Sequence, residues 1–337
     1  MQISQLKSIG LAIMVALTLT ACQPNPTAAD NNAAAATIPV PAFNADSAYA
    51  FTQMQVDFGP RVTGSDAHRK CGDWAVAKFK QYGATVIEQP FEAKTYDGRS
   101  LKARNIIASI NPEATHRLFV SAHWDSRDRA EEDKDPVMQK KPILGADDGA
   151  TGVAMMIEIA RILQATPLSK NIGVDLVMFD AEDLGKNDDE TGKSWALGSQ
   201  YWSANPFKVG YTARYGILLD MVGAKNAVFP KEGTSRHYAP EIQNKIWRIA
   251  QELGFGGLFA QIECNPVVDD HYFVNDIAKI PTVDIINLDL SPGNGSYKFG
   301  AYHHTHDDNM SIVDKSTLKV VGQVVTTVIV REAVMPL

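Results

Sequence analysis

The apolar positions of the chain follow two periods. Short apolar runs of the kind that forms buried strands occur at residues 84–91, 103–110, 117–123, 173–179, 215–220 and 281–287. A helical spacing of apolar residues begins near residue 46 and recurs over 66–82, 150–163, 238–253 and 315–332. Strands that alternate with helices in this way predict an α/β domain built on a mostly parallel central sheet.

Six loops at the edges of the predicted strands carry histidine or acidic residues. In open α/β sheets, ligands gather in the loops beyond the carboxyl ends of the strands. A single aspartate there is usually a helix cap or a turn former, and one histidine alone fits a buried core position. Together, the six loops predict a metal site. Imidazoles combined with carboxylates suit zinc, whereas calcium and magnesium sites use oxygen alone. The residues are His123, Asp125, Asp147, Asp148, Glu182, Asp183, Asp220, Asp269, Asp270, His271 and the segment 302–308.

Composition narrows the classes of protein that remain. With 337 residues, of which 45% are hydrophobic, the chain has ample material for one sizeable globular domain, or two. The net charge of −7 excludes the basic surface that binds nucleic acid. Cys71 and Cys264 form one disulfide or are both free and buried. Since no cysteine cluster exists, the predicted metal site rests on histidine and carboxylates.

The first residues have the pattern of a secretory signal. Lys7 precedes the apolar run IGLAIMVALTLT, and the segment 19–22, Leu-Thr-Ala-Cys, resembles a bacterial lipoprotein box. This resemblance implies a signal peptide over 1–21 and a lipid on Cys22; a plain signal with an incidental cysteine is the alternative. Residues 22–45 then predict a flexible tether, and 46–337 a single catalytic domain. The expected location is the bacterial cell envelope, facing the periplasm, with membrane contact through the lipid alone.

Several motifs follow one another along the chain. They are HxDS at 123–126, GADDGATG at 145–152, FDAED at 179–183, LLDMVG at 218–223, DDH at 269–271 and HTHDD at 304–308. The set, in this order, resembles the zinc-dependent exopeptidase family of aminopeptidases, and more closely its offshoot, the animal-type glutaminyl cyclases that also occur in bacteria. The resemblance covers about residues 50 to 330 and implies a three-layer sandwich with a central mixed, mostly parallel β-sheet flanked by helices.

The resemblance also implies roles for single residues. Asp148, Asp183 and His304 correspond to zinc ligands, and Glu182 corresponds to the general acid/base. Asp220 is expected to share a hydrogen bond with a second carboxylate near the substrate. Asp269 is the favoured partner, and Asp270 is the alternative.

The remaining residues predicted for the site are expected to line the substrate pocket. His123, Asp270 and His303 are expected there, and in the aminopeptidases the counterparts of His123 and Asp220 complete a second zinc site. Trp195 either forms a wall of a small side-chain pocket or packs in the core.

Two enzymatic reactions therefore compete, with a third class beside them. A one-zinc cyclase would convert N-terminal glutamine of peptides or proteins to pyroglutamate, and a two-zinc aminopeptidase would hydrolyse the first peptide bond. An inactive peptide- or metal-binding lipoprotein is the third possibility. The segment LLDMVGAKNAVFP favours the cyclase, and we expect a monomer. Two positions depart from the family pattern: Asp183 stands where most members have Glu, and Asp284 where animal cyclases have His.

Overall fold

The computed structural model describes residues 39–291 and 293–333. The predicted signal peptide, Cys22 and most of the predicted tether lie outside these residues. Among the described helices, none combines the length and the apolar composition needed to cross a bilayer.

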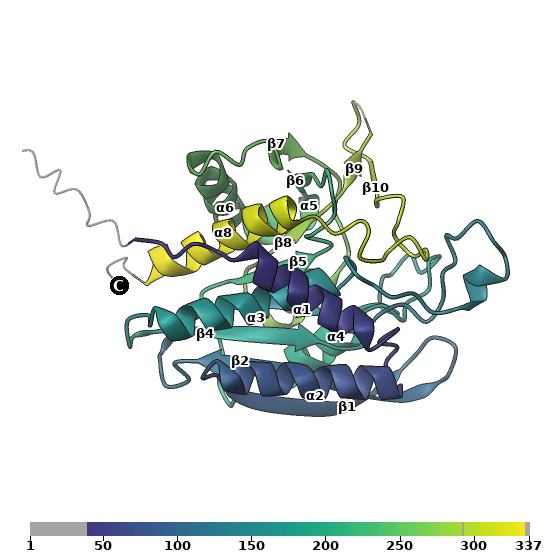
Figure 1. Ribbon diagram of the computed structural model, residues 1–337, viewed down its shortest axis with the longest axis horizontal. Coiled ribbons are helices and arrows are strands. Elements are labelled where there is room, and N and C mark those ends of the chain that lie inside the picture. The colour runs from purple at the N-terminus through teal and green to yellow at the C-terminus, as the bar shows by residue number, and fades with distance from the viewer. Residues whose placement is uncertain (1–38, 292, 334–337) are drawn as a thin grey trace, which may run out of the picture. The chain divides into compact units, whose positions relative to one another are not determined.

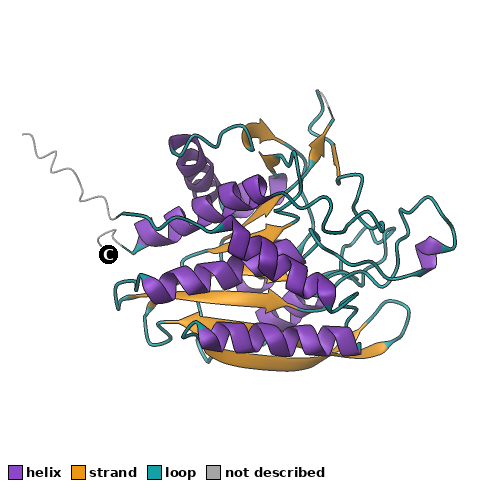
Figure 2. Cartoon of the chain, in the orientation of Figure 1, coloured by secondary structure: helices purple, strands orange, loops and turns teal. Residues whose placement is uncertain are grey.

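The described chain alternates helices and strands, as Figures 1 and 2 show. The helices are α1 Ala45–Asp57, α2 Asp66–Gln81, α3 Ala150–Ala165, α4 Leu197–Ala204, α5 Gly233–Tyr238, α6 Pro240–Glu252, α7 Asp270–Phe273 and α8 Lys315–Glu332, with short turns η1 Met138–Lys140 and η2 Val274–Ala278. The strands are β1 Thr85–Lys94, β2 Ser100–Ile110, β3 His116–His123, β4 Ile172–Phe179, β5 Gly216–Asp220, β6 Phe229–Lys231, β7 Phe259–Glu263, β8 Thr282–Ile286, β9 Asp289–Leu290 and β10 Tyr297–Lys298.

Six of these strands form the central sheet, in the order β1-β2-β4-β3-β5-β8. β4, β3, β5 and β8 pair in parallel, whereas β2 pairs antiparallel with both β1 and β4. The mixed, mostly parallel sheet predicted above is thus confirmed. The carboxyl ends of the four parallel strands meet at one edge, where their loops converge.

Helices cover both faces of this sheet and make the three layers. Alternate residues of β4 point to opposite faces, as the strand period of two requires. Val174, Leu176 and Met178 join a large core that includes residues of α1, α2, α3 and α8, which lie together on one side in Figure 1. Val177 and Phe179 join a second core with Trp202 of α4. The buried strands therefore read as continuous apolar runs.

The long elements agree with the sequence pattern, and the short ones differ from it. The predicted helix at 66–82 is α2, that at 150–163 is α3 and that at 315–332 is α8. The helices α4 and α5 and the two-stranded pairs β6–β7 and β9–β10 were not predicted, because two to eight residues are too few to show a period.

The predicted tether boundary at residue 45 is a few residues late. The Phe43 side chain is buried against Gly322 of α8, and its N–H donates to Gln323.

Candidate functional site

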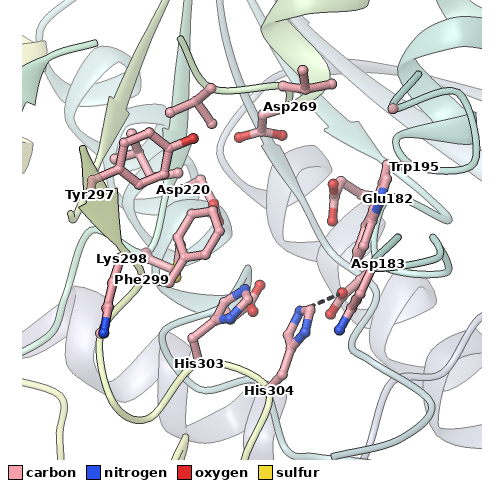
Figure 3. Close-up of a pocket in the computed structure, with 18 of the residues that line it drawn as sticks. Glu182, Asp183, Trp195, Asp220, Asp269, Tyr297, Lys298, Phe299, His303 and His304 are labelled. Carbon is pink, nitrogen blue, oxygen red and sulfur yellow. Dashed lines mark ion pairs between the residues drawn. The ribbon is translucent and has the colours of Figure 1, made fainter. Parts of the chain in front are cut away.

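A cavity of about 790 Å³ opens at the carboxyl edge of the parallel strands. Eight of the ten side chains predicted for the site line it. All of them except Asp148 are labelled in Figure 3, where they converge from separate loops. The other two, His123 and Asp270, are buried and do not line the cavity. His123 ends β3 beneath the carboxylates of other loops, and Asp270 is enclosed as the first residue of α7. The lining residues that were predicted are Asp148, Glu182, Asp183, Trp195, Asp220, Asp269, His303 and His304.

The chain leaves strand geometry where β4 ends, and this places Glu182 and Asp183 side by side. Ala181 adopts φ +55°, a left-handed conformation that side-chain-bearing residues rarely adopt. The carboxylate of Asp125 accepts the backbone N–H of Glu182 at 3.1 Å and that of Asp183 at 3.2 Å. Both neighbours consequently line the cavity.

Asp180 has a structural role at the base of the same loop. Its buried carboxylate lies 2.8 Å from Nε2 of His68 and accepts hydrogen bonds from the Thr63 hydroxyl and the Arg104 N–H. It does not line the cavity.

The GADDGATG turn carries Asp148 into the site. Gly149 begins α3 at φ +84°, and a Cβ there would lie 2.5 Å from the His123 carbonyl and 2.8 Å from its ring. Only glycine fits this close approach. On the other side, Asp308 accepts the N–H groups of Asp147 and Asp148, so two backbone donors fix the turn.

Asp148, His303 and His304 form a group that could hold a cation, and Asp183 adjoins it through His304. His304 Nε2 lies 3.1 Å from Asp183 Oδ1, as the dashed line in Figure 3 shows. Ligand atoms of Asp148, His303 and His304 lie within 4.8 Å of one another. Two atoms that bind one tetrahedral zinc at about 2.1 Å are about 3.4 Å apart, so these spacings fit. Both Asp183 oxygens are buried without a hydrogen-bond partner in the described chain, as a ligand to an added ion would be.

A second group adjoins the first and contains His123, Asp148 and Asp220. His123 Nε2 lies 2.9 Å from Asp148 and 3.3 Å from Asp220. Asp148 is common to both groups, which is the arrangement needed for a carboxylate to bridge two metals.

The carboxylates of the cavity are strongly perturbed by burial. Burial and the neighbouring Asp148 raise the pKa of Asp183 to about 6. Burial and the Asp269 carboxylate raise the pKa of Asp220 to about 8, and burial raises that of Glu182 well above its ordinary value. A divalent cation would offset this crowding of negative charge, and the mixed nitrogen and oxygen donors suit zinc.

Asp269 is the neighbouring carboxylate whose charge acts on Asp220, and both residues line the cavity. It lines the cavity in Figure 3, whereas Asp270 does not. Asp269 also accepts the N–H of Asp270 and so caps α7. Behind it, Asp284 is buried 3.8 Å from Nδ1 of His271 and contributes no atom to the cavity lining.

Trp195 lines the cavity and stacks against the ring of His304. Its ring lies 5.9 Å from that of His304 at an angle of 16°, and the Arg127 guanidinium lies 4.6 Å from the indole centre. The alternative of simple core packing is wrong, because the side chain is only half-buried and faces the cavity.

Two supporting residues, Arg127 and Glu131, were not predicted. Asp125 was expected at the strand end as one of the acids of the site, but not as the acceptor of two backbone N–H groups. Arg127 and Glu131 follow in the same loop and reach Asp183 and His304. No periodicity or spacing marks them, since their contacts depend on how distant loops fold together.

The fold and the site define an exopeptidase-like α/β protein with a candidate zinc centre at the edge of its sheet. The chain belongs to peptidase family M28, whose family model matches residues 105–329.

Among solved structures, the chain is similar to a Zn-dependent exopeptidase from Parabacteroides distasonis, with a TM-score of 0.82 and 46% identity over 87% of this chain and 99% of that one. It is also similar to a Bacteroides thetaiotaomicron glutaminyl cyclase bound to N-acetylhistamine, with a TM-score of 0.81 and 46% identity over 86% and 99%. A glutaminyl-peptide cyclotransferase from Gloydius blomhoffii is 29% identical over 71% of this chain and 67% of the relative.

Proposed function

We propose that the protein is a glutaminyl-peptide cyclotransferase, which converts N-terminal glutamine of peptides or proteins to pyroglutamate and releases ammonia. The observation that carries this proposal is the arrangement of Glu182, Asp220 and Asp269 around one cavity beside a candidate zinc group (Figure 3). The 46% identity to a glutaminyl cyclase supports the same conclusion.

The cyclisation needs proton transfer and orientation more than a strong nucleophile. The α-amine of the substrate attacks its own γ-carbonyl carbon, and a five-membered ring forms as the amide nitrogen leaves. Glu182 accepts the proton of the amine and delivers it to the departing nitrogen, which leaves as ammonia. Its raised pKa suits a group that both takes and gives a proton near neutral pH. Because the attack is intramolecular, orienting the two ends supplies much of the rate.

The other residues bind and orient the substrate or hold the metal. Asp148, Asp183 and His304 would bind one zinc ion, which when bound supplies the positive charge that polarises the γ-carbonyl. Asp220 and Asp269 orient the amine, and the Trp195 ring forms the wall of the side-chain pocket.

We further propose that one zinc ion is bound per chain. A second zinc would need Asp220 as an ionised ligand. Burial and the Asp269 charge raise the pKa of Asp220 to about 8, so Asp220 keeps a proton near neutral pH, which makes it a poor ligand. Metal analysis of the zinc-reconstituted protein should therefore find one tightly bound zinc; two would contradict this count.

A zinc aminopeptidase remains the second candidate function, because His123, Asp148 and Asp220 form a group that could hold a second metal. A paired assay separates the two. We expect ammonia release and an intact peptide chain with a glutamine-initiated peptide, and no cleavage of leucine p-nitroanilide. Cleavage of the leucine substrate would favour the aminopeptidase, and inactivity on both would favour a binding protein.

The cell-envelope location is proposed from the sequence pattern alone. Cys22 would carry the lipid that holds the domain at the membrane. Replacing Cys22 by Ala should move the protein from the membrane fraction to the soluble fraction, and an unchanged distribution would contradict the proposal. We also propose a monomer, for which light scattering of the domain lacking residues 1–38 should give the mass of one chain.

A further inference from the structure

Arg127 is a buried cation that joins four parts of the site. Its side chain is 1% exposed, although it sits in the loop after β3. One edge of the guanidinium meets the Glu131 carboxylate, with Nε–Oε1 at 3.0 Å and Nη2–Oε1 at 2.5 Å. Nη1 donates to the carbonyl of Asp183 at 2.8 Å, and Nη2 donates to Asn187 at 3.2 Å. Its flat face lies over the Trp195 ring.

Glu131 extends these contacts to the imidazole ring of His304. Its Oε1 lies 3.1 Å from Nδ1 of His304. The opposite ring nitrogen, Nε2, is the atom that lies 3.1 Å from Asp183. A carboxylate on one nitrogen of an imidazole fixes the proton there, and it leaves the other nitrogen free to bind a metal.

We propose that Arg127 and Glu131 are positioning residues, which together hold His304 and Asp183 in the arrangement that binds the cation. This inference rests on the proposed function, since it concerns the metal of that site. Glu131 acts through His304 by fixing its tautomer and ring orientation. Arg127 acts through Glu131 and through the Asp183 backbone, so that ligands from two distant loops share one support.

The geometry requires arginine and a carboxylate in these places. A planar guanidinium can bond Glu131, Asp183 and Asn187 in its plane while its face covers Trp195. A lysine ammonium has no flat face and no fork, so it would satisfy one of these partners at a time. Neither side chain lines the cavity of about 790 Å³, and both lie instead along a smaller one of about 260 Å³.

The test is the zinc affinity of the full chain, measured by competition with a chromogenic chelator at one pH. Glu131→Ala should weaken zinc binding by about 10- to 100-fold, the usual cost of losing a group that orients a metal ligand. Glu131→Gln, which keeps an acceptor for the Nδ1 proton but loses the charge, should fall between Glu131→Ala and the wild type. Arg127→Lys should weaken binding although the charge is kept. Arg129→Gln is the matched control: it removes a cation from the same loop whose partners are Asp128 and Tyr96, and it should bind zinc as the wild type does.

A double variant separates positioning from general damage to the fold. If Arg127 acts largely through Glu131, adding Arg127→Lys to Glu131→Ala should cost less than the product of the single effects. The melting temperature of each metal-free variant shows whether it is folded. Folded variants with wild-type zinc affinity would overturn the inference and leave the proposed function standing. If the variants bind zinc more weakly and the wild-type protein does not cyclise glutamine, the inference is supported and the proposed function is contradicted.

Discussion

Asp125 should contribute more to the active site than its place outside the cavity lining suggests. Its two oxygens accept the N–H groups of Glu182 and Asp183 at 3.1 and 3.2 Å, and the side chain is fully buried. Replacing Asp125 by Ala would leave both buried donors without a partner. The loop that carries the acid/base and a proposed ligand would then lose the contacts that hold its left-handed turn at Ala181.

The magnitude follows from the number of contacts. A hydrogen bond to a charged group contributes about 1.5–3 kcal/mol, so two such bonds give about 3–6 kcal/mol for Asp125→Ala. Removing Asp125 also removes its repulsion of the Asp180 carboxylate, since the Asp125 charge helps to raise the pKa of Asp180. This gain offsets part of the lost stability. Asp125→Asn keeps one acceptor and should lose about half as much. A displacement of Glu182 by about 1 Å should lower kcat roughly 100-fold.

The assay is urea unfolding of the zinc-loaded protein, combined with kcat for a glutamine peptide. Asp57→Asn is the control, since Asp57 is an exposed carboxylate at the end of α1. It should change the free energy of unfolding by less than about 0.5 kcal/mol. If Asp125→Ala unfolds within about 1 kcal/mol of the wild type and retains its kcat, the argument that Asp125 holds this loop is refuted.

Three further predictions concern the acid/base, the metal-free state and the thiols. Glu182→Gln should lower kcat by about 10²- to 10⁴-fold while zinc remains bound; normal turnover would contradict the role of Glu182. The pKa values of Asp183, Asp220 and His304 rise to about 6, 8 and 9, so the metal-free folded chain holds more protons than the unfolded chain. Its stability should therefore fall between roughly pH 5 and pH 8, and bound zinc should reduce the fall; a rising melting temperature would contradict this. Cys71 and Cys264 are free and buried, with thiol pKa values of about 11, so they should react with a thiol reagent only after denaturation.

The sign of the pH prediction is not changed by the acids whose pKa is lowered. His123 lowers the pKa of Asp148 despite its burial, and His304 and Arg127 lower that of Glu131. The stability from such groups is fully present above the ordinary carboxyl pKa of about 4 and is lost only below it. His303, whose pKa burial lowers to about 3, opposes the fall up to about pH 6.5, but the larger number of groups with raised pKa values decides the slope. Melting curves of metal-free and zinc-loaded protein at several pH values check this.

The strand pattern predicted that acids and histidines gather at one edge of the sheet, because parallel strands end there. The choice of Asp148, Asp183 and His304 among them as ligands came from the family resemblance, and it stays a prediction. The same reasoning placed His123 in the substrate pocket, whereas its ring is enclosed beneath Asp148 and Asp220. The position of a residue at a strand end predicts that it lies at that edge of the sheet, but not how deeply its side chain is buried. The burial of His123 depends on how closely Gly149 packs against its carbonyl and ring.

The supporting residues lie beyond what pattern reasoning can reach. Glu131 contacts His304 across 173 positions of the chain, and Arg127 contacts Asp183 across 56. The loop over 131–141 has no period, and its path is set by tertiary contacts such as that between Asp133 and His306. Arg127 donates to the backbone carbonyl of Asp183 at 2.8 Å and so supports the segment that carries this short carboxylate.

The central claim is that the site closes a ring without water. Incubating a glutamine-initiated peptide with the zinc-loaded protein, in water enriched in the heavy oxygen isotope, tests this directly by mass spectrometry. The account predicts a product that has lost the mass of ammonia and gained no heavy oxygen. A product that carries heavy oxygen in a new carboxylate, whether on the glutamine side chain or on a released residue, would show hydrolysis and contradict it.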